Sequence, residues 1–216
     1  MLKNSVSFAG FFLLLVTLLA CSSAYYKTME SFGVEKRDIL VDRVEEARDA
    51  QDSASEQFAS ALEQFRATVN FDGGELEDIY DRLDGEYESS AAEAARVSER
   101  IDAVENVAEA LFSEWEEELE QYSRDDMRRT SANLLKDTRT RYARLMKSMR
   151  RAESSMEPVL EAFHDQVLFL KHNLNARAIG ALRNELDSIE RDTARLIEQM
   201  QKAIAEAKAF IDSMES

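Results

Sequence analysis

The chain contains very little proline and glycine, with one Pro and six Gly in 216 residues. Average usage would give about 11 Pro and about 15 Gly at this length. Folds that need many turns or sheet corners depend on these residues, so their scarcity favours long, uninterrupted helices. A hydrophobic content of 44% is enough to fill a core, which argues against a wholly disordered chain.

The chain also has few cysteines and histidines, and fewer basic than acidic residues. The single cysteine excludes a disulfide within one chain and, with only two histidines, leaves little to build a metal site from. Lys and Arg number 27 against 43 Asp and Glu, which gives a formal net charge of −16. An acidic surface of this size repels phosphate, so we expect no nucleic-acid partner and no flat binding to an anionic lipid surface.

The apolar run near the amino terminus is short. Residues 8–20 form a run of about 13 residues that follows the basic Lys3, whereas a transmembrane helix needs about 20. A short basic start followed by a run of this length is typical of a signal peptide. We therefore expect residues 1–20 to be a targeting segment; an uncleaved anchor helix is the alternative.

The run ends in Leu18-Leu19-Ala20-Cys21, which resembles the lipobox of bacterial lipoproteins. This resemblance implies cleavage after Ala20 and attachment of a diacylglycerol to the thiol of Cys21. Ser22 follows where an Asp would favour retention in the inner membrane, so the resemblance implies the outer membrane, facing the periplasm. We expect residues 21–29 to act as a short tether to a helical domain.

Apolar residues recur at alternating spacings of three and four through most of residues 30–216. The pattern runs from Leu40 to Phe65, from Leu76 to Trp115 and from Ile179 to Met214. Such a seven-residue repeat is typical of helices that pack as left-handed supercoils, and a strand would alternate every second residue. We predict an all-α domain over residues 30–216, an elongated antiparallel coiled-coil bundle of three to four long helices.

Four interruptions divide this pattern. Residues 70–74 (Asn-Phe-Asp-Gly-Gly) predict a turn with glycine at positive φ. Ser123 and Asp126 have the spacing of a capping pair that starts a new helix. Pro158 removes a backbone donor, so it either starts a helix or kinks one; because the apolar pattern continues on both sides, we favour a kink. The polar residues 171–175 predict either a turn, giving four helices, or a stutter in one long helix, giving three.

The last interruption is also the candidate contact surface. Its polar side chains are His172, Asn173, Asn175 and Arg177. They could contact a partner, form the turn, or fix the register of the helices, as a buried Asn does in coiled coils.

Charge is divided unevenly between two neighbouring segments. Residues 71–122 contain eighteen acidic residues and three arginines, and residues 124–151 contain ten basic residues and three aspartates. Because opposite charges select which helices lie side by side, we predict that these two segments pack against each other. The acidic segment of the same chain is therefore a nearer partner for the arginine-rich stretch than a nucleic acid would be.

The sequence carries no constellation that points to catalysis. It lacks the Gly-x-x-x-x-Gly-Lys-Ser/Thr loop of nucleotide-driven machines. Glu161 and His164 have the Glu-x-x-His spacing of di-metal carboxylate bundles, but such a site needs two copies and His172 is preceded by Phe169 where the second Glu should be. We therefore predict neither an enzyme nor a metal or cofactor site.

Three segments carry a resemblance to a known family. They are Phe32-Gly-Val-Glu-Lys-Arg-Asp-Ile-Leu-Val-Asp-Arg43, Ala110-Leu-Phe-Ser-Glu-Trp115 and Val167-Leu-Phe-Leu-Lys-His-Asn-Leu-Asn-Ala-Arg-Ala-Ile179. In these, and across most of residues 25–214, the chain resembles a family of Gram-negative lipoproteins known only as a domain of unknown function. The resemblance implies no activity, substrate or catalytic residue.

Two functions fit these features. The first is a structural, scaffolding or protein-interaction role in the cell envelope, with a lipid anchor in the membrane and an envelope protein or a second copy as partner. The second is a bundle that holds a lipid or another apolar ligand in its core. The second rests on aromatic residues along the apolar pattern, which are Phe58, Phe65, Tyr80, Tyr87, Trp115, Phe163 and Phe169.

Overall fold

The computed structural model describes residues 35–70, 76–173 and 176–215, and every regular element in these ranges is an α-helix. The helices are α2 (Lys36–Val69), α3 (Leu76–Leu119), α4 (Asp125–Ser154), α5 (Met156–His172) and α6 (Ala176–Glu215). The predicted all-α fold is therefore confirmed. None of these helices combines the length and the apolar character that a membrane crossing requires.

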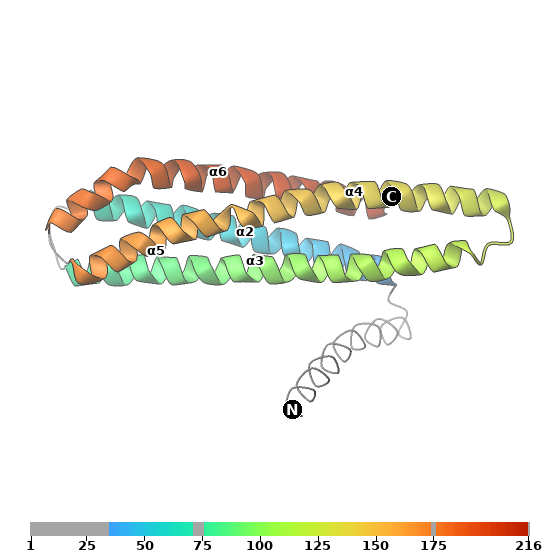
Figure 1. The fold of residues 1–216 in the computed structure, drawn as a ribbon, viewed down its shortest axis with the longest axis horizontal. Helices are drawn as coiled ribbons and strands as arrows, with labels where there is room; N and C mark the ends of the chain where they lie inside the picture. Colours follow the sequence, from blue (N-terminus) through green and yellow to red (C-terminus); the bar gives the residue numbers. More distant parts are fainter. Residues whose placement is uncertain (1–34, 71–75, 174–175, 216) are drawn as a thin grey trace, which may run out of the picture.

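The helices lie side by side as four long rods, because α4 and α5 follow one another along a single interrupted rod (Figure 1). α2 packs against α3 and α6, and the α4–α5 rod packs against the same two helices on their other side. Long-range ion pairs such as Arg100–Glu46 and Arg66–Glu190 tie neighbouring rods together. The four-helix alternative is thus right, and the three-helix alternative is wrong.

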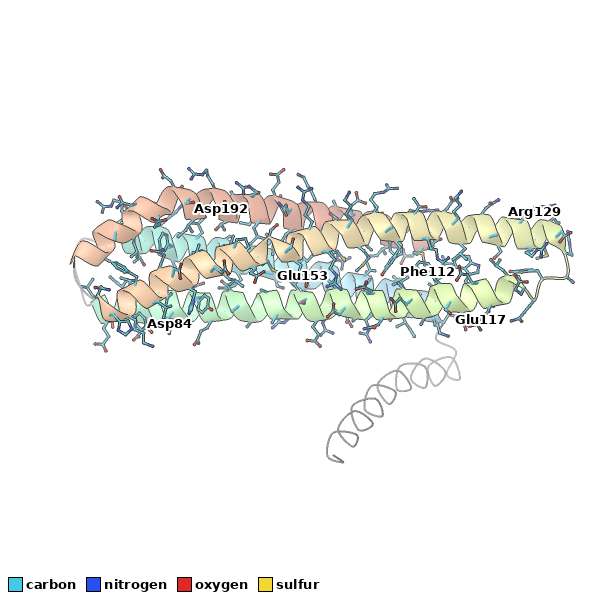
Figure 2. All side chains as sticks on the ribbon, in the orientation of Figure 1. Asp84, Phe112, Glu117, Arg129, Glu153 and Asp192 are labelled. Atoms are coloured by element: carbon cyan, nitrogen blue, oxygen red, sulfur yellow. The ribbon has the colours of Figure 1, made fainter. Side chains whose placement is uncertain are left out.

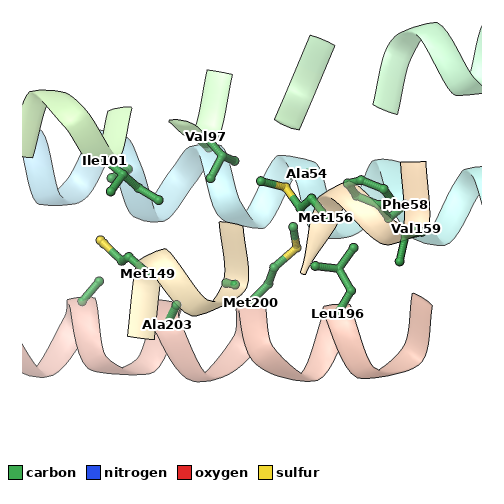
Figure 3. Close-up of a cluster of buried hydrophobic side chains, with 14 of the residues drawn as sticks. Ala54, Phe58, Val97, Ile101, Met149, Met156, Val159, Leu196, Met200 and Ala203 are labelled. Carbon is green, nitrogen blue, oxygen red and sulfur yellow. The ribbon is translucent and has the colours of Figure 1, made fainter. Parts of the chain in front are cut away.

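The core follows the apolar spacing of the sequence. Residues three and four positions apart share one face of a helix, and each rod turns such a stripe inward. Figure 3 shows part of this core, where Met149, Met156 and Met200 from three helices meet the small Ala54 and Ala203. Flexible methionine side chains fill the irregular space that alanines leave.

Pro158 breaks the α4–α5 rod, although at a position slightly before the proline. α4 ends at Ser154 and α5 begins at Met156, and the carbonyl of Ser154 is the one that a donor at residue 158 would have bonded. The hydroxyl of Ser155 donates to the carbonyl oxygen of Arg151 at 2.8 Å. The axis of α5 leans away from that of α4 (Figure 1). The predicted kink is confirmed.

The other helix ends lie close to the predicted positions, but the hydrogen bonds that cap them differ from the prediction. α2 ends before the predicted turn, where the side-chain amide of Asn70 donates to the carbonyl oxygen of Arg66 at 3.0 Å; residues 71–75 lie outside the described ranges. The capping pair predicted at Ser123 is wrong, because Arg124 occupies the N-cap of α4 and no side-chain bond caps the helix.

Fully buried polar side chains interrupt the apolar core, among them Gln51, Ser90 and Thr193. Gln51 in α2 and Thr193 in α6 are both 0% exposed. Neither polar atom of the Gln51 amide, nor the hydroxyl of Thr193, has a hydrogen-bond partner among the described residues. Buried groups of this kind lower stability, and in helical bundles they are used to fix one register.

Candidate functional site

The predicted contact surface forms the link between α5 and α6. α5 ends at the exposed His172, and Asn173 follows as its C-cap, with its side-chain amide donating to the carbonyl oxygen of Phe169 at 2.9 Å. Asn173 therefore ends a helix, and the stutter interpretation is wrong. Asn175 lies outside the described residues, and the backbone of Arg177 belongs to the first turn of α6. A partner contact here stays a prediction.

The predicted cleavage and lipidation residues precede the first described helix. Ala20 and Cys21, together with the rest of residues 1–34, lie outside the described ranges. The prediction of cleavage and lipidation at these residues therefore stays a prediction.

The Glu-x-x-His pair lines a shallow groove between α3 and α5. The imidazole of His164 stacks on the ring of Tyr87, with 4.9 Å between ring centroids. Glu161, Glu157 and Glu153 line the same groove of about 440 Å³. Among the described residues, no three His, Cys, Asp or Glu side chains are placed to hold one metal ion.

Most of the aromatic residues of the apolar pattern belong to the core. Phe58, Phe65 and Phe163 are fully buried, and the rings of Phe65 and Phe163 meet edge to face with centroids 6.2 Å apart. Phe169 is instead exposed on α5. The indole N–H of Trp115 donates to the hydroxyl oxygen of Ser131 at 2.8 Å, which joins α3 to α4.

Beyond Trp115, the α3–α4 hairpin extends past the ends of α2 and α6 (Figure 1). We call residues 116–134 the hairpin tip; Figure 2 shows Glu117 and Arg129 on its two helices. Residues 120–130 are all exposed. The large apolar side chains of Tyr122, Met127 and Leu134 are exposed as well, so the hairpin tip presents apolar surface between charged residues.

A groove lies where the hairpin tip meets the rest of the bundle. It has a volume of about 470 Å³ and is lined by residues from four helices, among them Lys36, Trp115, Leu134 and Met214. Lys36 donates to a carboxylate oxygen of Glu114 across it at 2.9 Å. The start of α2 is therefore at the same end of the bundle as the hairpin tip.

Ion pairs join the acidic and basic segments as the charge pattern predicts. Arg139 binds Glu116, and Arg150 binds Asp102 at 2.6 Å and Glu105 at 2.5 Å. The bond from Arg139 lowers the pKa of Glu116. The predicted packing of these two segments is confirmed.

Tyr142 lies beside these pairs, and its ring packs edge to face on that of Phe112, with centroids 5.3 Å apart. Burial, reinforced by the negative charges of Glu105 and Glu109, raises the pKa of Tyr142 to about 12. The phenol therefore stays neutral well above the pH at which a solvated tyrosine ionises.

Three further basic residues of α4 face α6, although the charge pattern predicted only pairing with the acidic segment. Arg144, Lys147 and Arg151 line a groove between α4 and α6, together with Arg195 and Lys202. Helical spacing is the signal that was missed. Arg139 and Arg150 are about three turns apart and share a face, whereas the other three cations are rotated from it by roughly 80–140°.

Comparison with known protein families identifies the family of this chain. No curated protein and no solved structure matches the chain. A family model described as a protein of unknown function, DUF2959, matches residues 25–214 and so covers nearly all of the helical domain. This match agrees with the resemblance carried by the three sequence segments, and the chain belongs to the DUF2959 family of proteins of unknown function.

Proposed function

We propose that this protein is a lipid-anchored periplasmic bundle that binds a protein partner, or a second copy of itself, in the cell envelope. Cys21 would carry the lipid, and the outer membrane facing the periplasm is the expected site. We further propose that the four rods pack as an antiparallel coiled coil, because the seven-residue repeat supplies the core of each rod.

The hairpin tip is the observation that carries this proposal. Exposed apolar side chains on a projecting pair of helices are the surface that partner proteins commonly bury. Met127 and Leu134 are about half exposed, at 48% and 52%. They project from the end of the bundle at which α2 begins, so a partner held there would also be held near the anchor.

Photo-crosslinking in living cells tests the proposal. A photoreactive amino acid at Met127 or Leu134 should give defined crosslinked products. The matched control is Leu168, which is similarly exposed at 43% but lies in α5 near the other end of the bundle. Equal products from Leu168, or no product from Met127 and Leu134, would refute the hairpin tip as the contact surface.

The apolar-ligand hypothesis has less support from the packing. Phe65 and Phe163, two of the largest fully buried side chains, contact one another, and aromatic pairs of this kind stabilise a core without any ligand. Native mass spectrometry of the purified chain tests this hypothesis, since a lipid that co-purifies adds a defined mass.

A further inference from the structure

The α4–α6 groove concentrates positive charge on a strongly acidic protein. Its lining contains five cations, Arg144, Lys147, Arg151, Arg195 and Lys202, and only two carboxylates, Glu198 and Glu206. The whole chain, by contrast, has a net charge of −16. The groove is thus a local region whose charge is opposite to that of the molecule. The repulsion of phosphate that we expected from the net charge of the chain therefore does not apply to this groove.

Three of the five cations have no acidic partner within the described part of the chain. Lys202 is paired with Glu198 at 2.6 Å and Arg195 with Asp192 at 3.3 Å. Arg144, Lys147 and Arg151 are exposed and form no ion pair with any described residue. The acidic residues Asp102, Glu105 and Glu116 of α3 are bound instead by Arg139 and Arg150.

These cations line one groove from two helices. Arg144, Lys147 and Arg151 follow a spacing of three and four along α4, which puts them on one face. A second row with the same spacing lies on α6 and consists of Arg195, Gln199 and Lys202. The two rows line opposite walls of the groove, which has a volume of about 400 Å³. The neutral side chains of Ser148 and Gln199 lie between the charged ones as further donors.

We propose that the α4–α6 groove is a binding site for a phosphate-bearing anion. A phosphate monoester carries between one and two negative charges at neutral pH in a compact group, and planar guanidinium groups bind its oxygens in pairs. Cations on both walls favour such a group over a lone carboxylate, because the oxygens of a phosphate are arranged tetrahedrally and can be reached by donors from two sides.

The phosphate can come from a soluble molecule or from a lipid headgroup. Fourteen residue steps separate Cys21 from Glu35, and an extended chain of this length spans up to about 50 Å. Glu35 and Thr138 line the same groove at the tether end, and Arg144 lies six residues, roughly 9 Å, farther along α4. With the lipid that the proposed function places on Cys21, on which this step rests, headgroups of the anchoring membrane would be within reach of the site.

Titration of the full chain, held in a nonionic detergent, with pyrophosphate tests the site directly. The variant Arg144→Gln/Lys147→Gln/Arg151→Gln should weaken binding by about tenfold or more, because it removes three charge-assisted contacts. The control Arg129→Gln/Lys171→Gln/Lys208→Gln removes the same charge from exposed positions outside the groove and should bind like the wild type. Added salt should weaken wild-type binding.

A gain-of-function variant guards against loss of folding as an explanation. Glu198→Gln/Glu206→Gln removes the two carboxylates of the groove, so pyrophosphate should bind several-fold more tightly. No tightening in this variant, together with equal weakening in the two triple variants, would overturn the proposal.

A second measurement distinguishes the two sources of phosphate. The lipidated chain is placed in vesicles of phosphatidylcholine, with or without phosphatidylglycerol, and acetylation of Lys147 and Lys202 is compared with that of Lys171 and Lys208. If acetylation slows only at the groove lysines, and only in phosphatidylglycerol vesicles, the site binds a lipid phosphate. If pyrophosphate binds but acetylation does not change in this way, the site binds a soluble phosphate. If neither probe has an effect that depends on the groove, the proposal is wrong.

Discussion

Replacing Gln51 with Leu should stabilise the protein. Gln51 is fully buried and neither polar atom of its amide has a partner among the described residues. A buried polar group without a hydrogen bond costs about 1–3 kcal/mol, and a similar-sized hydrophobic substitute costs less than about 1.5 kcal/mol in repacking. We therefore expect the free energy of unfolding to rise by roughly 1–2 kcal/mol, which is an increase of about 3–6 °C in Tm.

Urea denaturation and thermal melting of the chain from residue 22 onward measure this change. The control is Gln201→Leu on the exposed face of α6, which should change stability by less than about 0.5 kcal/mol. Light scattering adds a second test, since loss of a buried polar residue should allow additional oligomers if Gln51 fixes the register. A less stable Gln51→Leu variant would show that the amide makes stabilising contacts and would refute the reasoning.

Four further outcomes are expected. Cys21→Ser should leave an uncleaved precursor that incorporates no labelled fatty acid; normal processing would refute the anchor. Arg150→Gln should lower the free energy of unfolding by about 1 kcal/mol at low salt and less at high salt, whereas Arg129→Gln should have no effect in melting experiments. Stability should fall between pH 10 and about pH 12, because the unfolded state loses the phenol proton of Tyr142 before the folded state does; Tyr142→Phe should reduce this fall in urea titrations at each pH. Asn173→Leu should cost about 1 kcal/mol without new oligomers in light scattering, because it removes a helix-terminal hydrogen bond; new oligomers would favour a register role.

The sequence was sufficient for features that depend on local chemistry. Scarce proline and glycine, with apolar residues spaced by three and four, predicted long helices, and the positions of the breaks followed from single residues such as Pro158. The capping pair at Ser123 failed because a cap depends on one hydrogen bond, and competing side chains decide whether it forms. The polar stretch after His172 was ambiguous, because a turn and a stutter share the same composition.

Tertiary structure alone decided which face of each helix meets which neighbour. The basic stretch of α4 was correctly assigned to the acidic α3, and yet Arg144, Lys147 and Arg151 face α6, because their positions around the helix differ from those of Arg139 and Arg150. Composition sums charge along a segment, whereas a helix distributes it around an axis. Only the placement of α6 beside α4 joins cations separated by some fifty residues into one groove, and only the lengths of four rods leave the hairpin tip uncovered.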